Sequence, residues 1–145
     1  MDASNIQHVE ADLYCGGQPS EIELAALAAA GVRTAINLRP PGEFDGYPEA
    51  RVVADLGMRY RQIGISGSSD LTRDKIAEFC EALTAARAIG PVLVYCRSGN
   101  RVGAAIALVE AWMHQCCPDE ALARGRRAGM TGLEEAVKQI LQQAP

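Results

Sequence analysis

A cysteine and an arginine five positions later are the residues of this sequence best suited to chemistry. Cys96 follows the apolar segment 91–95 and precedes Gly99, Arg101 and an alanine-rich segment. We predict a strand, a loop and a helix here, so that several backbone N–H groups and the positive end of the helix point at one spot. Such surroundings favour the thiolate, the nucleophilic form of cysteine. The segment therefore predicts a Cys96 nucleophile and an Arg101 clamp that holds an oxyanion through two N–H bonds.

The residues between this pair are predicted to line the same pocket. A glycine in the loop removes a Cβ that would obstruct a tight turn around an anion. We assign substrate binding to the four intervening residues, Arg97, Ser98, Gly99 and Asn100. Another interpretation is a buried cysteine at a strand end with solvated arginines around it.

Two earlier turns are predicted to border this pocket. Gln18 and Arg39 each follow a predicted strand, and the carboxyl ends of parallel strands meet at one edge of a sheet. Arg39 is thus a candidate for a second anion contact. Alternatively, it is a surface arginine paired with Glu43.

Alternating strands and helices place these residues on an α/β fold. Strands are predicted around 13–15, 32–38, 60–65 and 92–95, and helices at 21–30, 48–56, 72–89 and from the Cys96 loop to residue 113. Two further helices are predicted from Pro118 to Gly129 and from Thr131 through Gln142, the second with capping-box spacing between Thr131 and Glu134. We expect a small central sheet of about four to five strands flanked by helices, in one domain spanning 1–145.

Composition excludes several other classes of protein. The net charge of −4 argues against nucleic acid as a partner, because phosphate backbones select basic surfaces. No apolar run approaches the length of a membrane span, and the first residues lack a basic region before an apolar one, so we predict a cytoplasmic protein without membrane contact. The five cysteines lack metal-ligand spacing, so no metal and no organic cofactor is predicted.

Several spaced motifs carry a resemblance to a known family. They are the segments 17–20, 30–40, 91–101 with its following helix, 119–123 and 128–129. Together they resemble the cysteine-dependent phosphatase superfamily in its small dual-specificity-like branch, and more narrowly the bacterial phosphatase-like domain found with beta-lactamase-like hydrolases. The resemblance implies a dual-specificity-phosphatase-like fold and hydrolysis of phosphate monoesters, in a phosphorylated protein or small molecule, through a phosphocysteine.

The loop departs from the phosphatase pattern in its length. Those enzymes carry five residues between cysteine and arginine, whereas four separate Cys96 from Arg101, and Val102 stands where the phosphatase arginine would be. The shorter loop resembles that of rhodanese-type sulfurtransferases, which implies a Cys96 persulfide formed from a sulfane-sulfur donor. A non-catalytic oxyanion-binding module, or a redox sensor in which Cys15 resolves an oxidised Cys96, are further alternatives.

A phosphatase of this kind also needs a general acid to protonate the leaving oxygen. Related enzymes take an aspartate from a loop upstream of the cysteine. Asp70, in a glycine- and serine-rich loop, is the candidate that the resemblance indicates, and Asp74 is the second. The alternative for Asp70 is a turn carboxylate without a catalytic role.

Overall fold

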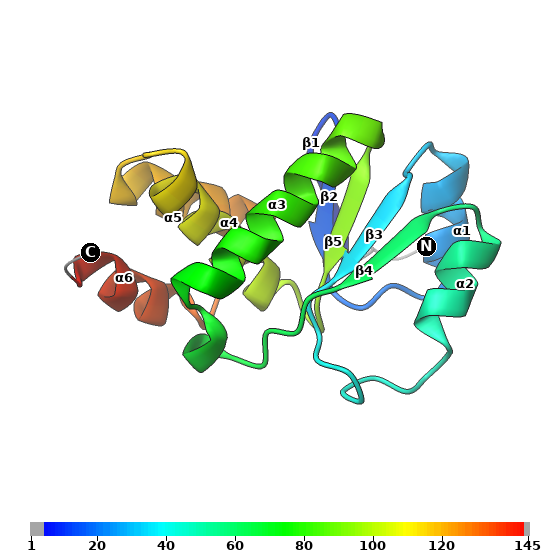
Figure 1. Ribbon diagram of the computed structural model, residues 1–145, viewed down its shortest axis with the longest axis horizontal. Helices are drawn as coiled ribbons and strands as arrows, with labels where there is room; N and C mark the ends of the chain where they lie inside the picture. Colours follow the sequence, from blue (N-terminus) through cyan, green and yellow to red (C-terminus); the bar gives the residue numbers. More distant parts are fainter. Residues whose placement is uncertain (1–4, 144–145) are drawn as a thin grey trace.

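A computed structural model, which describes residues 5–143, has one five-stranded sheet with helices on both faces (Figure 1). The strands are β1 (Ile6–Glu10), β2 (Leu13–Gly16), β3 (Thr34–Asn37), β4 (Arg59–Gln62) and β5 (Val92–Tyr95). The helices are α1 (Glu21–Ala29), α2 (Glu49–Asp55), α3 (Arg73–Ile89), α4 (Asn100–Met113), α5 (Pro118–Ala128) and α6 (Glu134–Gln142), with a short 3-10 turn at Ser68–Asp70. The predicted α/β class and strand number are confirmed.

The order of the strands brings four carboxyl ends to one edge of the sheet. The order is β1-β2-β5-β3-β4, and β5 pairs in parallel with both β2 and β3, while β4 pairs in parallel with β3. The loops that follow these strands therefore emerge together, where ligands bind in open α/β sheets. Cys96 follows the central strand, β5, directly.

The two faces of the sheet carry separate apolar cores. Helices α3 to α6 cover one face, and α1 and α2 cover the other (Figure 1). Alternate residues of a strand point to opposite faces, so in β5 Val94 packs in the larger core and Leu93 in the smaller one. All four residues of β5 are buried, which explains why this strand reads as an uninterrupted apolar run.

Two features differ from the sequence-based expectation. The first is β1, an antiparallel edge strand whose residues are exposed or half-buried, so it lacks the apolar signal of a core strand. The second is the start of α6, where the predicted capping box is wrong. The N-cap is Leu133, without a side-chain hydrogen bond, and the Thr131 N–H donates instead to the side chain of Asn100.

Candidate active site

The loop after β5 curls around the sulfur of Cys96. The Cys96 N–H donates to the Gly16 carbonyl at 3.1 Å, which continues the pairing of β5 with β2. The Gly99 N–H donates to Cys96 Sγ, also at 3.1 Å. Gly99 has a φ of 96° immediately before α4, a conformation that glycine adopts without strain. The sulfur thus lies against a backbone donor at the start of a 14-residue helix, as the sequence predicted.

Close backbone contacts fix the outer side of this loop. The Gln18 N–H donates to the Arg97 carbonyl at 3.1 Å, and a Cβ added to Gly17 would lie 2.6 Å from that same oxygen. On the other side, a Cβ added to Gly129 would lie 2.8 Å from the Gly99 carbonyl. Glycine is therefore required at both positions for the loop to sit where it does.

Arg101 is held by a carboxylate from another loop. Its Nη1 and Nη2 donate to the Glu43 carboxylate at 2.9 and 2.7 Å, and Nη1 also donates to the Ile65 carbonyl at 2.9 Å. Such a two-point pairing fixes the plane of the guanidinium as well as its position. The Arg101 side chain is only 12% exposed, whereas Glu43 is 30% exposed, so the pair lies at the surface with its arginine largely covered.

The charges of this cluster stabilise one another. Hydrogen bonding to Arg101 lowers the pKa of Glu43 to about 2, with a smaller contribution from Arg39. Glu43 in turn raises the pKa of Arg101, and Cys96 adds to this effect through its own contact with the guanidinium. The predicted nucleophile, Cys96, and the predicted oxyanion clamp, Arg101, are therefore neighbours in the structure.

Arg39, on the loop that follows β3, contacts the same Glu43 carboxylate that Arg101 binds. Its Nε donates to Glu43 Oε1 at 2.8 Å, and its Nη1 donates to Gln18 Oε1 at 2.9 Å. The structure thus brings Arg39 and Gln18 together at the site edge and also gives Arg39 the Glu43 partner considered as its alternative. The structure therefore shows the side chains of Arg39 and Gln18 bound to each other. Contact of either residue with substrate stays a prediction.

A half-buried polar network supports the end of β5. The Glu49 carboxylate accepts hydrogen bonds from the Tyr95 hydroxyl at 2.7 Å, from Gln18 at 2.9 Å and from Asn37 at 3.2 Å. Burial raises the pKa of Tyr95, and hydrogen bonding to Glu49 raises it further, so its hydroxyl remains a donor. Since Tyr95 precedes Cys96 in the chain, this network anchors the residue from which the loop departs.

Asp70, the predicted general acid, has its carboxylate bonded within its own loop. Its Oδ2 accepts hydrogen bonds from the Ser66 backbone N–H at 2.8 Å and the Ser66 hydroxyl at 2.7 Å. These bonds lower the pKa of Asp70. Ser66 follows Ile65, whose carbonyl accepts a hydrogen bond from Arg101, so the loop that carries Asp70 contacts the predicted oxyanion clamp. Asp74 lies in the first turn of α3.

The remaining loop residues differ in what their side chains contact. Asn100 Oδ1 accepts hydrogen bonds from the backbone N–H groups of Thr131 and Leu133 at 2.9 and 3.0 Å. Its side chain therefore joins the start of α4 to the segment before α6. Arg97 and Ser98 are exposed and remain predicted substrate contacts.

Cys15, the candidate resolving cysteine, is fully buried in the same core cluster as Cys96. Burial raises the pKa of its thiol to about 12. A thiol in this state supplies little thiolate at neutral pH, and thiolate is the form that attacks an oxidised sulfur. The structure thus gives the redox-sensor interpretation little support.

Glu43 is the residue of the site that the sequence interpretation missed, since it was considered only as a surface partner of Arg39. The feature of the sequence that could have indicated Glu43 is its position in the loop after β3, because this loop emerges at the same sheet edge as the Cys96 loop. The contact itself joins residues 58 positions apart, and no local pattern specifies it.

Residues 5–143 contain neither a cluster of metal-ligating residues nor a membrane-spanning helix. In that part of the chain, no group of three or more histidine, cysteine, aspartate or glutamate residues could hold a metal ion. None of its helices is long and apolar enough to cross a membrane.

Comparison with known proteins identifies relatives that match most of the chain. A beta-lactamase hydrolase-like protein of Xylella fastidiosa is 34% identical over 136 residues, which cover 91% of this chain and 31% of that protein. A protein of the same description from Agrobacterium fabrum is 35% identical over 103 residues, covering 68% of this chain and 23% of that protein. The chain thus spans about a third or less of the length of these relatives.

Solved structures of phosphatases share the fold. TpbA of P. aeruginosa has a TM-score of 0.76 at 17% identity, over 97% of this chain and 85% of that chain. A kinase associated phosphatase has a TM-score of 0.73 at 16% identity, over 90% of this chain and 83% of that chain. These likenesses confirm the dual-specificity-phosphatase-like fold.

Residues 5–113, which include the whole Cys96 loop and α4, match the family described as "Beta-lactamase hydrolase-like protein, phosphatase-like domain". The match confirms the resemblance drawn from the spaced motifs and supports the prediction of a cysteine-dependent phosphatase. The chain belongs to the phosphatase-like domain family of the beta-lactamase hydrolase-like proteins.

Proposed function

We propose that this domain hydrolyses phosphate monoesters, with Cys96 as the nucleophile. The observation that carries the proposal is the Cys96 sulfur at the start of α4, bonded to the Gly99 N–H and next to Arg101. A phosphoryl group brought to this sulfur would meet the backbone donors and the guanidinium together. Those groups stabilise the negative charge of the equatorial oxygens as the transition state develops.

The reaction proceeds in two steps. The Cys96 thiolate attacks phosphorus, the bond from phosphorus to the ester oxygen breaks, and the leaving oxygen takes a proton from Asp70. Water then attacks the phosphocysteine, which releases inorganic phosphate and regenerates the thiolate, while Asp70 regains its proton. Asp70 is assigned this role because its loop borders Arg101 through Ile65. Since its present bonds to Ser66 favour the carboxylate, Asp70 must leave Ser66 to act as an acid.

The substrate class is a phosphorylated protein or small molecule. One of the fold neighbours, TpbA, has been crystallised in complex with pTyr, which makes an aryl phosphate the natural first substrate to test. Arg39 and Gln18 form the wall behind Glu43, and we assign them to shaping the pocket entrance.

A second candidate is sulfur transfer. The four-residue interval between Cys96 and Arg101 favours it, because this length resembles the rhodanese loop. Cys96 would accept a sulfane sulfur from thiosulfate, release sulfite, and pass the sulfur to cyanide as thiocyanate. No general acid is needed for this reaction, so Asp70 would then have no catalytic role.

Two assays on one preparation separate these functions. We expect phosphate release from p-nitrophenyl phosphate that is lost in Cys96→Ser and retained in Cys117→Ser, the matched control at an exposed cysteine before α5. Thiocyanate formation that depends on Cys96, without phosphate release, would replace the proposal with sulfur transfer. The absence of both activities would favour an oxyanion-binding module.

A further inference from the structure

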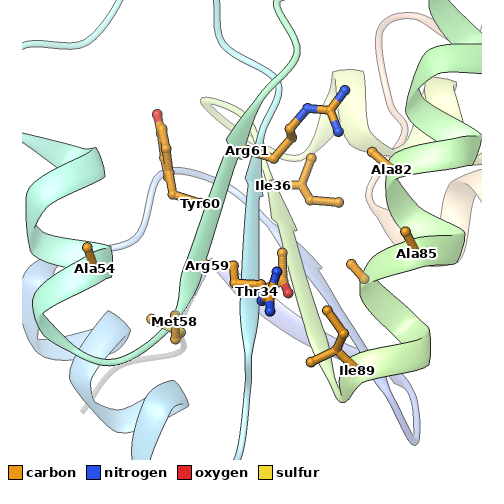
Figure 2. Close-up of a pocket in the computed structure, with 11 residues that line it drawn as sticks. Thr34, Ile36, Ala54, Met58, Arg59, Tyr60, Arg61, Ala82, Ala85 and Ile89 are labelled. Carbon is orange, nitrogen blue, oxygen red and sulfur yellow. The ribbon is translucent and has the colours of Figure 1, made fainter.

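A groove separate from the catalytic loop follows β4, at the edge of the sheet, with α3 on one side and Ala54 and Tyr60 on the other. Its volume is about 510 Å³, within the range of small-molecule sites. Figure 2 shows Ile36 on the sheet facing Ala82 and Ala85 on the helix, with Ile89 at one end. No residue of the loop from Cys96 to Arg101 lines it, so its use does not depend on the proposed phosphatase activity.

The floor of the groove contains a polar atom without a partner. Thr34 is 5% exposed, and its Oγ1 is buried with no hydrogen-bond partner in the described part of the chain. Leaving a buried hydroxyl unpaired costs free energy, and such groups in native proteins call for an explanation. A bound ligand whose polar atom forms a hydrogen bond with Thr34 Oγ1 would explain why the protein itself provides no partner.

Two arginines give the groove a positive charge. Arg59 pairs in register with Thr34, and Arg61 with Ile36, so both follow the alternation that directs them to the α3 side (Figure 2). Arg61 has a partner in Glu78, at 3.7 Å and with both side chains about half exposed. Arg59 forms no ion pair with any residue in the range 5–143. This guanidinium is thus available to an anion.

We infer that the groove binds a small organic anion with an apolar body, such as a fatty or aromatic carboxylate or sulfonate. The anionic head would pair with Arg59 and Arg61, and the hydrocarbon would lie against Ile36, Ala85 and Ile89. A ligand of this class complements both the positive charge of the two arginines and the apolar side chains of the groove. An oxygen of the same anionic head would accept a hydrogen bond from the Thr34 hydroxyl, since Thr34 and Arg59 pair in register.

The test uses the folded protein and 1-anilinonaphthalene-8-sulfonate, an aromatic anion that fluoresces when bound. We expect saturable one-to-one binding that octanoate displaces. Arg59→Gln should weaken binding about tenfold, the value of one charge-assisted hydrogen bond, and Ala85→Trp should abolish it by filling the groove. The matched controls are Arg51→Gln, an exposed arginine of α2, and Ala88→Trp, an exposed alanine of α3 outside the groove, and both should bind normally.

Two further measurements keep the inference falsifiable. Thr34→Val removes the hydroxyl at constant shape, so it should weaken binding while the melting temperature of the free protein stays equal or rises. Orthovanadate, which resembles phosphate, should leave the probe in place. Displacement by orthovanadate, absence of saturable binding, or unchanged affinity in both Arg59→Gln and Ala85→Trp would overturn the assignment.

Discussion

The anion side of the site, from Cys96 to Arg101, and the acid side, residues 66–70, are held by different kinds of contact. The anion side is fixed by strand pairing at Cys96, by the close approach of Gly17 and Gly129, and by the Glu43 pairing of Arg101. On the acid side, Asp70 is bonded to Ser66, four positions away in its own loop. The proposed oxyanion site is therefore built into the sheet edge, whereas the proposed proton donation by Asp70 would require its loop to rearrange.

This comparison predicts that the largest loss of activity comes from a change at Arg101, on the anion side. Arg101→Lys keeps the positive charge but loses the planar pair of donors that Glu43 orients. We expect kcat for p-nitrophenyl phosphate to fall about 10²–10³-fold, the usual cost of removing an oxyanion donor. Arg126→Lys, at an exposed arginine paired with Glu134, is the control and should keep full activity. Equal activity in the two variants would show that Arg101 does not hold the oxyanion.

On the acid side, the loss of activity in an Asp70 variant should depend on the leaving group of the substrate. Asp70→Asn cannot donate a proton, so hydrolysis of phenyl phosphate, a poor leaving group, should slow by about 10²-fold. Hydrolysis of p-nitrophenyl phosphate should change little, because its leaving oxygen needs less protonation. The ratio of the two kcat values is the measurement. Asp74→Asn is the matched control, and a selective loss in that variant would move the acid to α3.

The sequence is informative about the anion side because its signals are local. The apolar run of β5, the cysteine at its end and the glycine before α4 are adjacent in the chain, and they predict a strand, a loop and a helix without long-range knowledge. The family motifs strengthened this interpretation. The strand, the Cys96 loop and the helix could therefore be predicted before the structure was known, while the role of Cys96 stays a prediction.

What the sequence did not reveal depends on contacts between distant segments. Glu43 and Arg101 are 58 positions apart, and Asn100 and Thr131 are 31 apart. Thr131 has the residue spacing of a capping box, yet its N–H is bound by Asn100, so tertiary structure overrides the local pattern. β1 was not predicted because it is an exposed edge strand, which its pairing with β2 specifies rather than burial of its side chains.

A smaller effect on turnover is expected from the residue that orients the clamp. Glu43→Gln leaves Arg101 in the site but removes the charged two-point partner, so the guanidinium is less well positioned. We expect kcat to fall about tenfold, less than for Arg101→Lys, because misplacement costs less than loss of the donors. Glu120→Gln, at an exposed carboxylate paired with Arg124, is the control. A gain in kcat would instead mean that Glu43 competes with the substrate for Arg101.

The same variant has a pH signature. Since Arg101 lowers the pKa of Glu43 to about 2 in the folded protein, the pair stabilises the fold fully above the unfolded value of about 4.3. That contribution is lost as the pH falls from there toward 2. Between pH 6 and 3, the free energy of unfolding should therefore decrease more in the wild type than in Glu43→Gln. Parallel pH curves for the two proteins would contradict the pairing.

The smallest effect on turnover is expected where the anion side is attached to the C-terminal helices. Asn100→Ala removes the acceptor of two backbone N–H groups, at Thr131 and Leu133, which lie near the surface and can turn to water. The free energy of unfolding should therefore fall by about 0.5–1.5 kcal/mol, the net value of a typical hydrogen bond. Turnover at 25 °C should change little, because the Cys96 and Arg101 contacts do not pass through this side chain. Asn100→Asp, which retains an acceptor oxygen, should recover most of the stability. If Asn100→Ala lost activity at unchanged stability, Asn100 would contact the substrate as the sequence predicted, and the anion side would extend to the first residue of α4.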